Sequence, residues 1–85
     1  MKKDDRPPLA PADVALLRFE QRWPGPSWAK TTKMRPELGV TMARYQQRLA
    51  VLVRDPRAVE AFPEVCAAYV RRAEMNASAR SSRSF

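Results

Sequence analysis

The sequence predicts an all-α protein: a compact bundle of four or five short helices that contains a helix-turn-helix, with disordered termini. Apolar residues recur at three- and four-residue spacing along several stretches, which is the period of one helical face. Proline-containing segments separate these stretches. The 85 residues suffice for one small domain with a thin core. We expect a flexible arm over residues 1–10, a helical domain over 11–75 and a flexible basic tail over 76–85.

The first helix should begin at Pro11 and run to about Arg22. Proline suits the opening turn of a helix because its fixed φ is helical and its missing N–H is not needed there. The segment Pro24-Gly25-Pro26 then interrupts the helical hydrogen bonds. Ser27 can cap the second helix that follows.

A turn is predicted between the second and third helices. Two ends of the second helix stay open: Leu38, which Gly39 follows, and a position near Met34, because Pro36 removes a helical N–H. Gly39 can take the left-handed conformation that ends many helices. Thr41 stands where an N-cap should, so that the third helix can start at Met42.

The third helix has two contrasting faces. Its apolar face carries Met42, Tyr45, Leu49, Leu52 and Val53. Its opposite face carries Ala43, Arg44, Gln47, Val51 and Arg54, with Gln46 and Arg48 on the flanks. Arginine and glutamine side chains can each form paired hydrogen bonds with base edges in the major groove. This face is therefore typical of a recognition helix.

Two further helices follow. Asp55 and Pro56 predict the start of a short helix that runs to about Phe62. Pro63 should open the last helix, which we expect to end near Arg72. Cys66 lies on the apolar face of this helix and is expected to be a small buried residue.

The charge balance points to a polyanionic partner. Sixteen Lys and Arg face nine Asp and Glu, a formal net charge of +7, and the excess is concentrated between residues 30 and 54. Lys30 and Lys33 are placed to reach phosphates. Thr41, Arg44 and Gln47 are the first candidates for base contacts. The predicted DNA-binding residues are Lys30, Lys33, Thr41, Arg44, Gln47, Arg48 and Arg54.

The composition argues against an enzyme. The chain has no histidine, one cysteine and two glycines, which leaves no Cys/His metal site, no histidine-activated nucleophile, no internal disulfide and no glycine-rich phosphate loop. We therefore expect no catalytic residues, metal or cofactor. The single cysteine fits a reducing cytoplasm, and the absence of a long apolar run and of a secretory pattern predicts a soluble chain without a membrane partner.

The chain resembles a small family, known from actinobacteria and their phages, that is labelled a domain of unknown function and described as helix-turn-helix-like. The resemblance runs from about Val14 to Arg72. It is carried by Leu17, Phe19, Glu20, Trp23, Ala29-Lys30, Leu38-Gly39, Arg44-Tyr45, Leu49, Leu52, Asp55-Pro56, Ala58 and Pro63. Leu38-Gly39 and the capped helix after it also resemble, more loosely, region four of sigma factors. The resemblance implies transcription-related binding of double-stranded DNA.

Two other interpretations stay open. The chain could be a protein-interaction module, such as a phage protein that docks on a host regulator or RNA polymerase, with Trp28, Met42 and Val51 as anchors if they are exposed. Trp28 would otherwise complete the core. A basic helix that lies on a membrane surface is less consistent with the polar third helix. A homodimer is a further expectation, because one small DNA-binding unit often needs a second copy for useful affinity.

Overall fold

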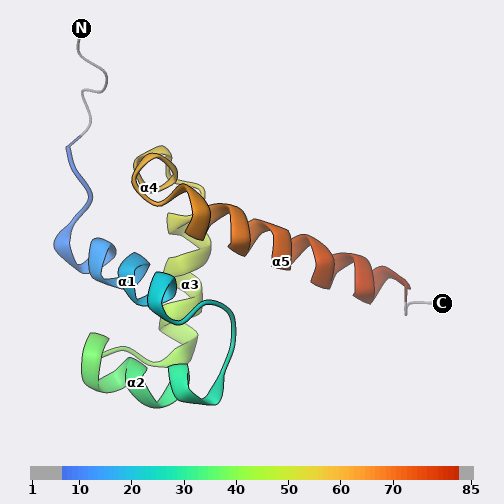
Figure 1. The fold of residues 1–85 in the computed structure, drawn as a ribbon, viewed down its shortest axis with the longest axis horizontal. Helices are drawn as coiled ribbons and strands as arrows, with labels where there is room; N and C mark the ends of the chain where they lie inside the picture. Colours follow the sequence, from blue (N-terminus) through green and yellow to red (C-terminus); the bar gives the residue numbers. More distant parts are fainter. Residues whose placement is uncertain (1–6, 83–85) are drawn as a thin grey trace, which may run out of the picture.

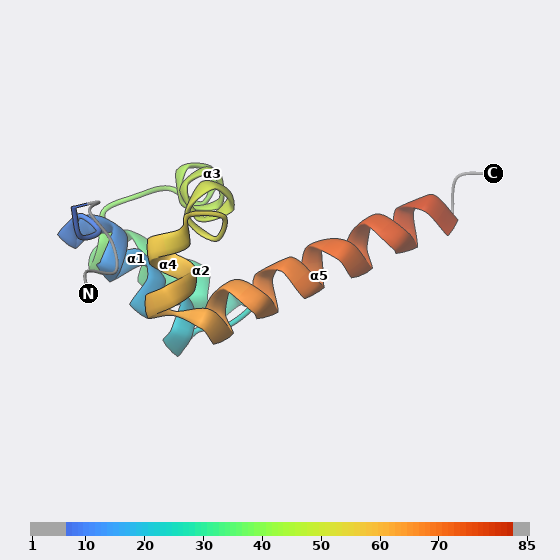
Figure 2. The same ribbon diagram turned by 90° about the horizontal axis from the view of Figure 1, so that it is seen from above.

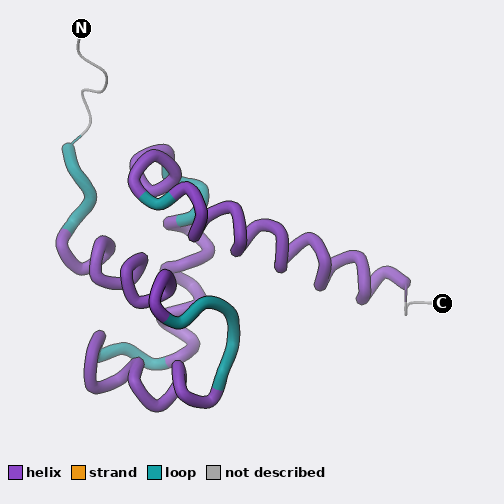
Figure 3. The backbone as a smooth tube through the Cα atoms, in the orientation of Figure 1, coloured by secondary structure: helices purple, strands orange, loops and turns teal. Residues whose placement is uncertain are grey.

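Five helices and no strand make up the part of the chain that the computed structural model describes, residues 7–82, with side chains described for residues 7–79 (Figures 1 and 3). They are α1 (Pro11–Arg22), α2 (Trp28–Leu38), α3 (Met42–Leu52), α4 (Pro56–Ala61) and α5 (Pro63–Ser82). The predicted all-α fold class is confirmed.

Helix α1 is the centre of the packing. It contacts α2, α3 and α5, while α4 packs against α5. The rings of Phe19 on α1 and Tyr45 on α3 meet edge to face, with centroids 5.7 Å apart. The buried apolar residues of the core are Leu16, Leu17, Phe19, Met34, Tyr45, Leu49, Leu52, Val53, Ala58, Val65 and Cys66. Helix α3 is thus fixed by one face against α1, as its apolar spacing predicted.

The predicted helix starts are confirmed. Helix α1 begins at Pro11, and the Ser27 hydroxyl accepts a hydrogen bond from the backbone N–H of Lys30 at 3.0 Å. A carboxylate oxygen of Asp55 accepts from the Arg57 N–H at 2.9 Å at the start of α4. Each cap satisfies a backbone donor that has no partner within its own helix.

Helix α2 continues through Pro36 to Leu38, the end that Gly39 indicates, and does not stop near Met34, where Pro36 favoured an earlier end. Proline removes one N–H from the last turn, yet the Gly39 N–H donates to the Arg35 carbonyl at 2.8 Å and closes that turn. The carbonyl that Pro36 leaves without a helical donor belongs to Thr32, which is exposed and so open to water. One lost hydrogen bond in a solvated final turn is therefore tolerated.

Helix α5 is also longer than predicted. We expected it to end near Arg72 and a tail to begin at Asn76, but the helix continues to Ser82. Alanines at 73, 77 and 79 favour the helix, and neither glycine nor proline interrupts it after Pro63. Figure 2 shows its second half extending away from the other helices. Residues 83–85 of the predicted tail lie outside the described residues.

The predicted N-terminal arm is partly packed. Residues 1–6 lie outside the described residues. After them, Leu9 packs against the core, and the Arg57 guanidinium donates to the Pro7 carbonyl at 3.0 Å. Residues 7–10 are therefore held against the helical body.

Within the described range, no helix has the length and apolar character needed to span a lipid bilayer.

Candidate nucleic-acid interface

The turn between α2 and α3 has the geometry that the sequence predicted. Gly39 adopts a left-handed conformation with φ of 69°. The Thr41 hydroxyl accepts from the Arg44 N–H at 3.3 Å and caps α3. Together with Val40 and Arg48, these residues line a shallow hollow of about 520 Å³ at the start of α3. The turn therefore brings two arginines and a threonine hydroxyl to one place on the surface.

Helix α3 presents its polar side to solvent. Tyr45 and Leu49 are buried, so the rotation of the helix about its axis is fixed. The residues of the opposite face are all exposed: Ala43, Arg44, Gln47 and Val51 on the helix, and Arg54 two residues after its end at Leu52. Arg44 and Gln47 thus lie on consecutive turns of one open face, without covering side chains.

The other predicted site residues differ in availability. Lys33 on α2 is exposed, and within the described part of the chain neither it, Arg44 nor Arg54 forms an ion pair. Arg48 is half-buried, and its guanidinium contacts a carboxylate oxygen of Asp13 at 2.6 Å. Three of the predicted cations are therefore free to meet a polyanion, and a fourth is held by α1.

Lys30 is a correction to the sequence-based site. Its side chain is only 2% exposed, and its ammonium group donates to the Glu20 carboxylate and, at 3.1 Å, to the Gly25 carbonyl. It also lies 5.0 Å from the centre of the Tyr45 ring. Reaching a phosphate would require breaking these contacts and exposing Glu20, which is 3% exposed. Lys30 therefore belongs to the interior of the fold.

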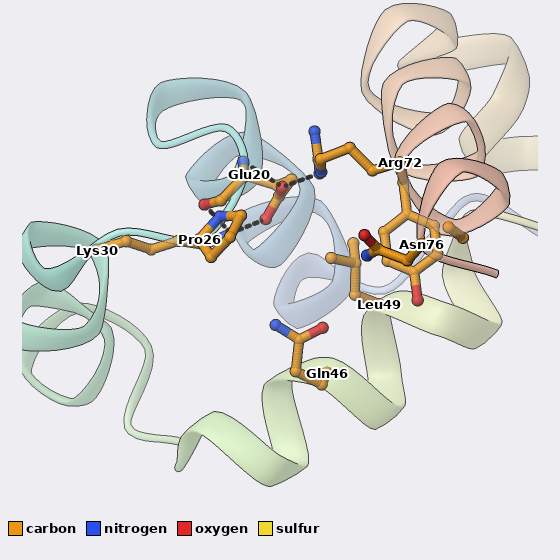
Figure 4. Close-up of a pocket in the computed structure, with 10 residues that line it drawn as sticks. Glu20, Pro26, Lys30, Gln46, Leu49, Arg72 and Asn76 are labelled. Atoms are coloured by element: carbon orange, nitrogen blue, oxygen red, sulfur yellow. Dashed lines mark hydrogen bonds and ion pairs between the residues drawn. The ribbon is translucent and has the colours of Figure 1, made fainter. Parts of the chain in front are cut away.

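Glu20 is the centre of a buried polar network that sequence reasoning missed. One carboxylate oxygen accepts from Lys30 and from the Tyr45 hydroxyl. The other accepts from the Gly25 N–H at 3.2 Å and from the Arg72 guanidinium at 3.1 Å. Figure 4 shows Lys30 and Arg72 reaching Glu20 from opposite sides. The network joins α1, α2, α3, α5 and the loop between α1 and α2.

The spacing of residues in α1 and α2 indicates this network. Glu20 follows Leu16 by four residues and Leu17 by three, so it lies on the inward face of α1. Lys30 precedes the buried Met34 by four residues on α2. A carboxylate and an ammonium group on two inward faces predict an ion pair, because an unpaired buried charge is costly.

Next to the network lies a hollow of about 350 Å³ (Figure 4). Its walls are Glu20, Gly25, Pro26, Lys30, Gln46, Leu49, Tyr69, Arg72, Ala73 and Asn76. Glu20, Lys30 and Arg72 are bonded to one another in this lining, and the Arg72 side chain is 35% exposed, so the hollow has a positively charged wall beside the Gln46 and Asn76 amides. No cluster of metal-binding side chains occurs within the described residues.

Comparison with known proteins gives the family. Residues 8–83 match the model of a family described as a protein of unknown function, DUF3263. The chain belongs to the DUF3263 family. No curated protein and no solved structure matches it. The family description names no activity, so the function of this DUF3263 domain has to be argued from its surface and charge.

Tyr45 and Cys66 of the DUF3263 domain have raised pKa values, and both groups are structural. Burial raises the pKa of the Tyr45 phenol far above its usual range, and the hydrogen bond and the charge of Glu20 raise it further. Burial also raises the pKa of the Cys66 thiol, which lies in the core as predicted. Both groups stay protonated at neutral pH, so neither is an activated nucleophile or base.

Within the described residues five large apolar side chains are exposed: Trp28, Val51, Val59, Val70 and Met75. Trp28, the first residue of α2, is 81% exposed and does not complete the core. Val51, on the outer face of α3, is 71% exposed. Met42, the third proposed anchor, is half-buried and packs against the core. Phe19 is buried, while Trp23 is half-buried.

Proposed function

We propose that this DUF3263 domain is a small double-stranded DNA-binding protein that regulates transcription and places α3 in the major groove. One observation carries the proposal. Helix α3 turns Arg44 and Gln47 to solvent while Tyr45 and Leu49 are buried on its other side. A rigidly held helix with exposed bidentate donors is what base reading requires.

The roles follow from exposure and chemistry. Arg44 reads a guanine and Gln47 an adenine, each by a pair of hydrogen bonds, and the small Ala43 side chain allows close approach. Thr41 lines the hollow at the start of the same helix, where it contacts the groove edge; Arg48, which is paired with Asp13, lines the same hollow. Lys33 and Arg54 bind phosphates on either side.

Charge supports the same partner. The formal net charge is +7, and in the part of the chain that the structure describes the exposed Lys33, Arg44 and Arg54 of this surface form no ion pair. A polyanion releases counterions when it meets such a surface, which gives affinity without sequence preference. The resemblance of the turn and of α3 to region four of sigma factors agrees with a role in transcription.

Fluorescence anisotropy tests the proposal on two kinds of DNA: a duplex selected in vitro for tight binding to the wild type, and random duplexes. Arg44→Ala should lose about 10- to 100-fold in affinity for the selected duplex and little for random DNA, because one bidentate base contact is removed. Lys33→Ala should weaken binding to all duplexes alike and reduce the salt slope by about one. Arg18→Ala, which removes an exposed charge from α1, is the matched control and should bind as the wild type does. A wild-type protein that fails to bind duplex DNA at low salt would contradict the proposal.

A protein-interaction module is the second candidate, and the 81% exposure of Trp28 favours it. An aromatic side chain of that size is an effective anchor when a partner covers it. In a nuclease-treated pull-down, a host regulator or RNA polymerase should then be retained by the wild type and by Arg44→Ala but lost by Trp28→Ala. Retention that depends on Arg44 and on nucleic acid would favour the DNA-binding function instead.

A further inference from the structure

The outer face of α5 has no cover within the described residues. On the side turned away from α1 it carries Ala67, Arg71, Glu74 and Ser78, all exposed, with Val70 at its edge. Residues 73–79 are exposed on every side, and Figure 2 shows this half of the helix standing clear of the body. Short helices without tertiary packing are marginal in water. A partner for the projecting half would therefore stabilise it.

An apolar hollow adjoins this face. It has a volume of about 370 Å³ and lies where α4 and the end of α3 meet α5. Its lining is Val53, Val59, Pro63, Cys66, Ala67 and Val70, with Arg71 and Glu74 at its rim. Val59 and Val70 are 44% and 40% exposed, so the hollow offers apolar area to an incoming helix.

The charges at the rim identify the helix that fits. Arg71 and Glu74 have opposite charges, and within the described part of the chain neither forms an ion pair. They stand at equal distances on either side of the midpoint of α5, which runs from Pro63 to Ser82. A two-fold axis at that midpoint would place each arginine opposite a glutamate, as an isologous interface requires.

We propose that the outer face of α5 is a dimerisation surface, on which α5 of a second copy of this chain packs antiparallel about an axis between residues 72 and 73. Arg71 then pairs with the partner's Glu74, and Glu74 pairs with the partner's Arg71. Ala67 lies opposite the partner's Ser78, and these small side chains let the helices approach closely. The proposal does not depend on DNA binding.

The same register also covers the projecting half. Because the axis bisects α5, the two helices overlap along all of their 20 residues, about 30 Å. The projecting half of each copy lies on the anchored half of the other and covers its apolar hollow. A shift of one helical turn would place Arg71 opposite the partner's Ser78 or near the partner's Arg71, so that the Arg–Glu pairs are lost, and would leave one turn of each helix uncovered. The Arg–Glu pairs and the full overlap of the two helices therefore both favour the register about residues 72 and 73.

Sedimentation equilibrium of the full chain tests the interface. The wild type should dimerise at micromolar to high-micromolar concentration, and more weakly as salt rises. Arg71→Glu alone and Glu74→Arg alone each turn two attractive pairs into two like-charge pairs, which should raise the dissociation constant about tenfold or more. The double variant Arg71→Glu/Glu74→Arg should restore it to within about threefold of the wild type. Arg35→Glu, an equal change of charge on α2, is the matched control and should dimerise normally.

Disulfide trapping gives a second measurement that keeps the charges intact. Ala67→Cys/Ser78→Cys places the two new thiols opposite each other across the axis and should give a covalent dimer under mild oxidation. Ser78→Cys alone leaves the two copies of residue 78 about 16 Å apart and should not cross-link. A wild type that stays monomeric at high-micromolar concentration, or a double charge swap that fails to recover, would overturn the proposal.

Discussion

Glu20 shows how one residue can organise a small core. Its buried carboxylate accepts hydrogen bonds from Lys30, Tyr45, Arg72 and the Gly25 N–H, which come from three helices and a loop. Each donor reduces the cost of keeping a charge out of water. Lys30 and Arg72 bring two positive charges to one carboxylate, so the network has a net positive charge. Water can solvate this charge at Arg72, because its side chain is 35% exposed. The network therefore fixes where α2, α3 and α5 meet α1.

Replacement of Lys30 by methionine should destabilise the fold strongly. The substitution keeps the apolar stem but removes the ammonium group, so Glu20 retains only Tyr45, Gly25 and the half-exposed Arg72 as partners. We expect a loss of about 3 kcal/mol in the free energy of unfolding, measured by urea denaturation. Lys33→Met, on the exposed face of α2, should change it by less than about 0.5 kcal/mol. Equal losses for the two variants would contradict the structural role of Lys30.

Tyr45 predicts a loss of stability at alkaline pH. Burial, with the hydrogen bond and the charge of Glu20, raises the phenol pKa in the folded state. The unfolded chain releases this proton near pH 10, whereas the folded protein keeps it, so the free energy of unfolding should fall by about 1.4 kcal/mol per pH unit above that pH. Tyr45→Phe has no such proton and should show a correspondingly shallower decline between pH 10 and 11.5. At neutral pH it should be less stable by about 1 kcal/mol, because Glu20 loses one donor. Parallel stability curves for the two proteins above pH 10 would contradict this assignment.

At the scale of the elements, single residues predict where most helices begin and where turns interrupt them. They do not predict the contacts between residues far apart in the sequence, such as those of Glu20. Gly39 and Thr41 specify the turn before α3 through their own backbone and hydroxyl chemistry. The length of α2 depended on whether the tertiary fold tolerates Pro36, which local propensity does not decide. The charge of Lys30 predicts a phosphate contact, but its position on the inward face of α2 places it in the interior instead.

Gly39→Ala tests whether the left-handed backbone of residue 39 is needed for the turn between α2 and α3. A Cβ at this position would have no atom within 4 Å, so the substitution acts through the left-handed backbone alone. We expect a loss of about 1 kcal/mol in the free energy of unfolding, because residues with a Cβ disfavour positive φ. Gly39→Asn should lose less, since asparagine tolerates this conformation better. A denaturation midpoint for Gly39→Ala equal to that of the wild type would show that the turn relaxes into another conformation.

At the scale of the whole molecule, the two proposed surfaces belong to different helices. The described chain measures 52 × 33 × 18 Å, and its longest dimension follows from the projecting half of α5. Helix α3 points its basic face away from the core, whereas the outer face of α5 is nearly neutral, with Arg71 and Glu74 side by side. A dimer through α5 would carry two copies of α3, as recognition of a two-part DNA site requires.

Hydrogen exchange should distinguish the half of α5 that packs on the core from the half that projects away from it. In dilute, monomeric protein, amides around Cys66 and Tyr69 should be protected by the core, while those at the projecting end, where the side chains of residues 77–79 are exposed, should exchange almost freely. At concentrations where the chain dimerises, the partner's anchored half should cover this segment and slow its exchange. Arg71→Glu should keep the fast exchange at the same concentration, whereas Arg35→Glu should not. Strong protection of residues 77–82 in dilute protein would mean that the projecting half is stable on its own, and the case for a covering partner would lose its physical basis.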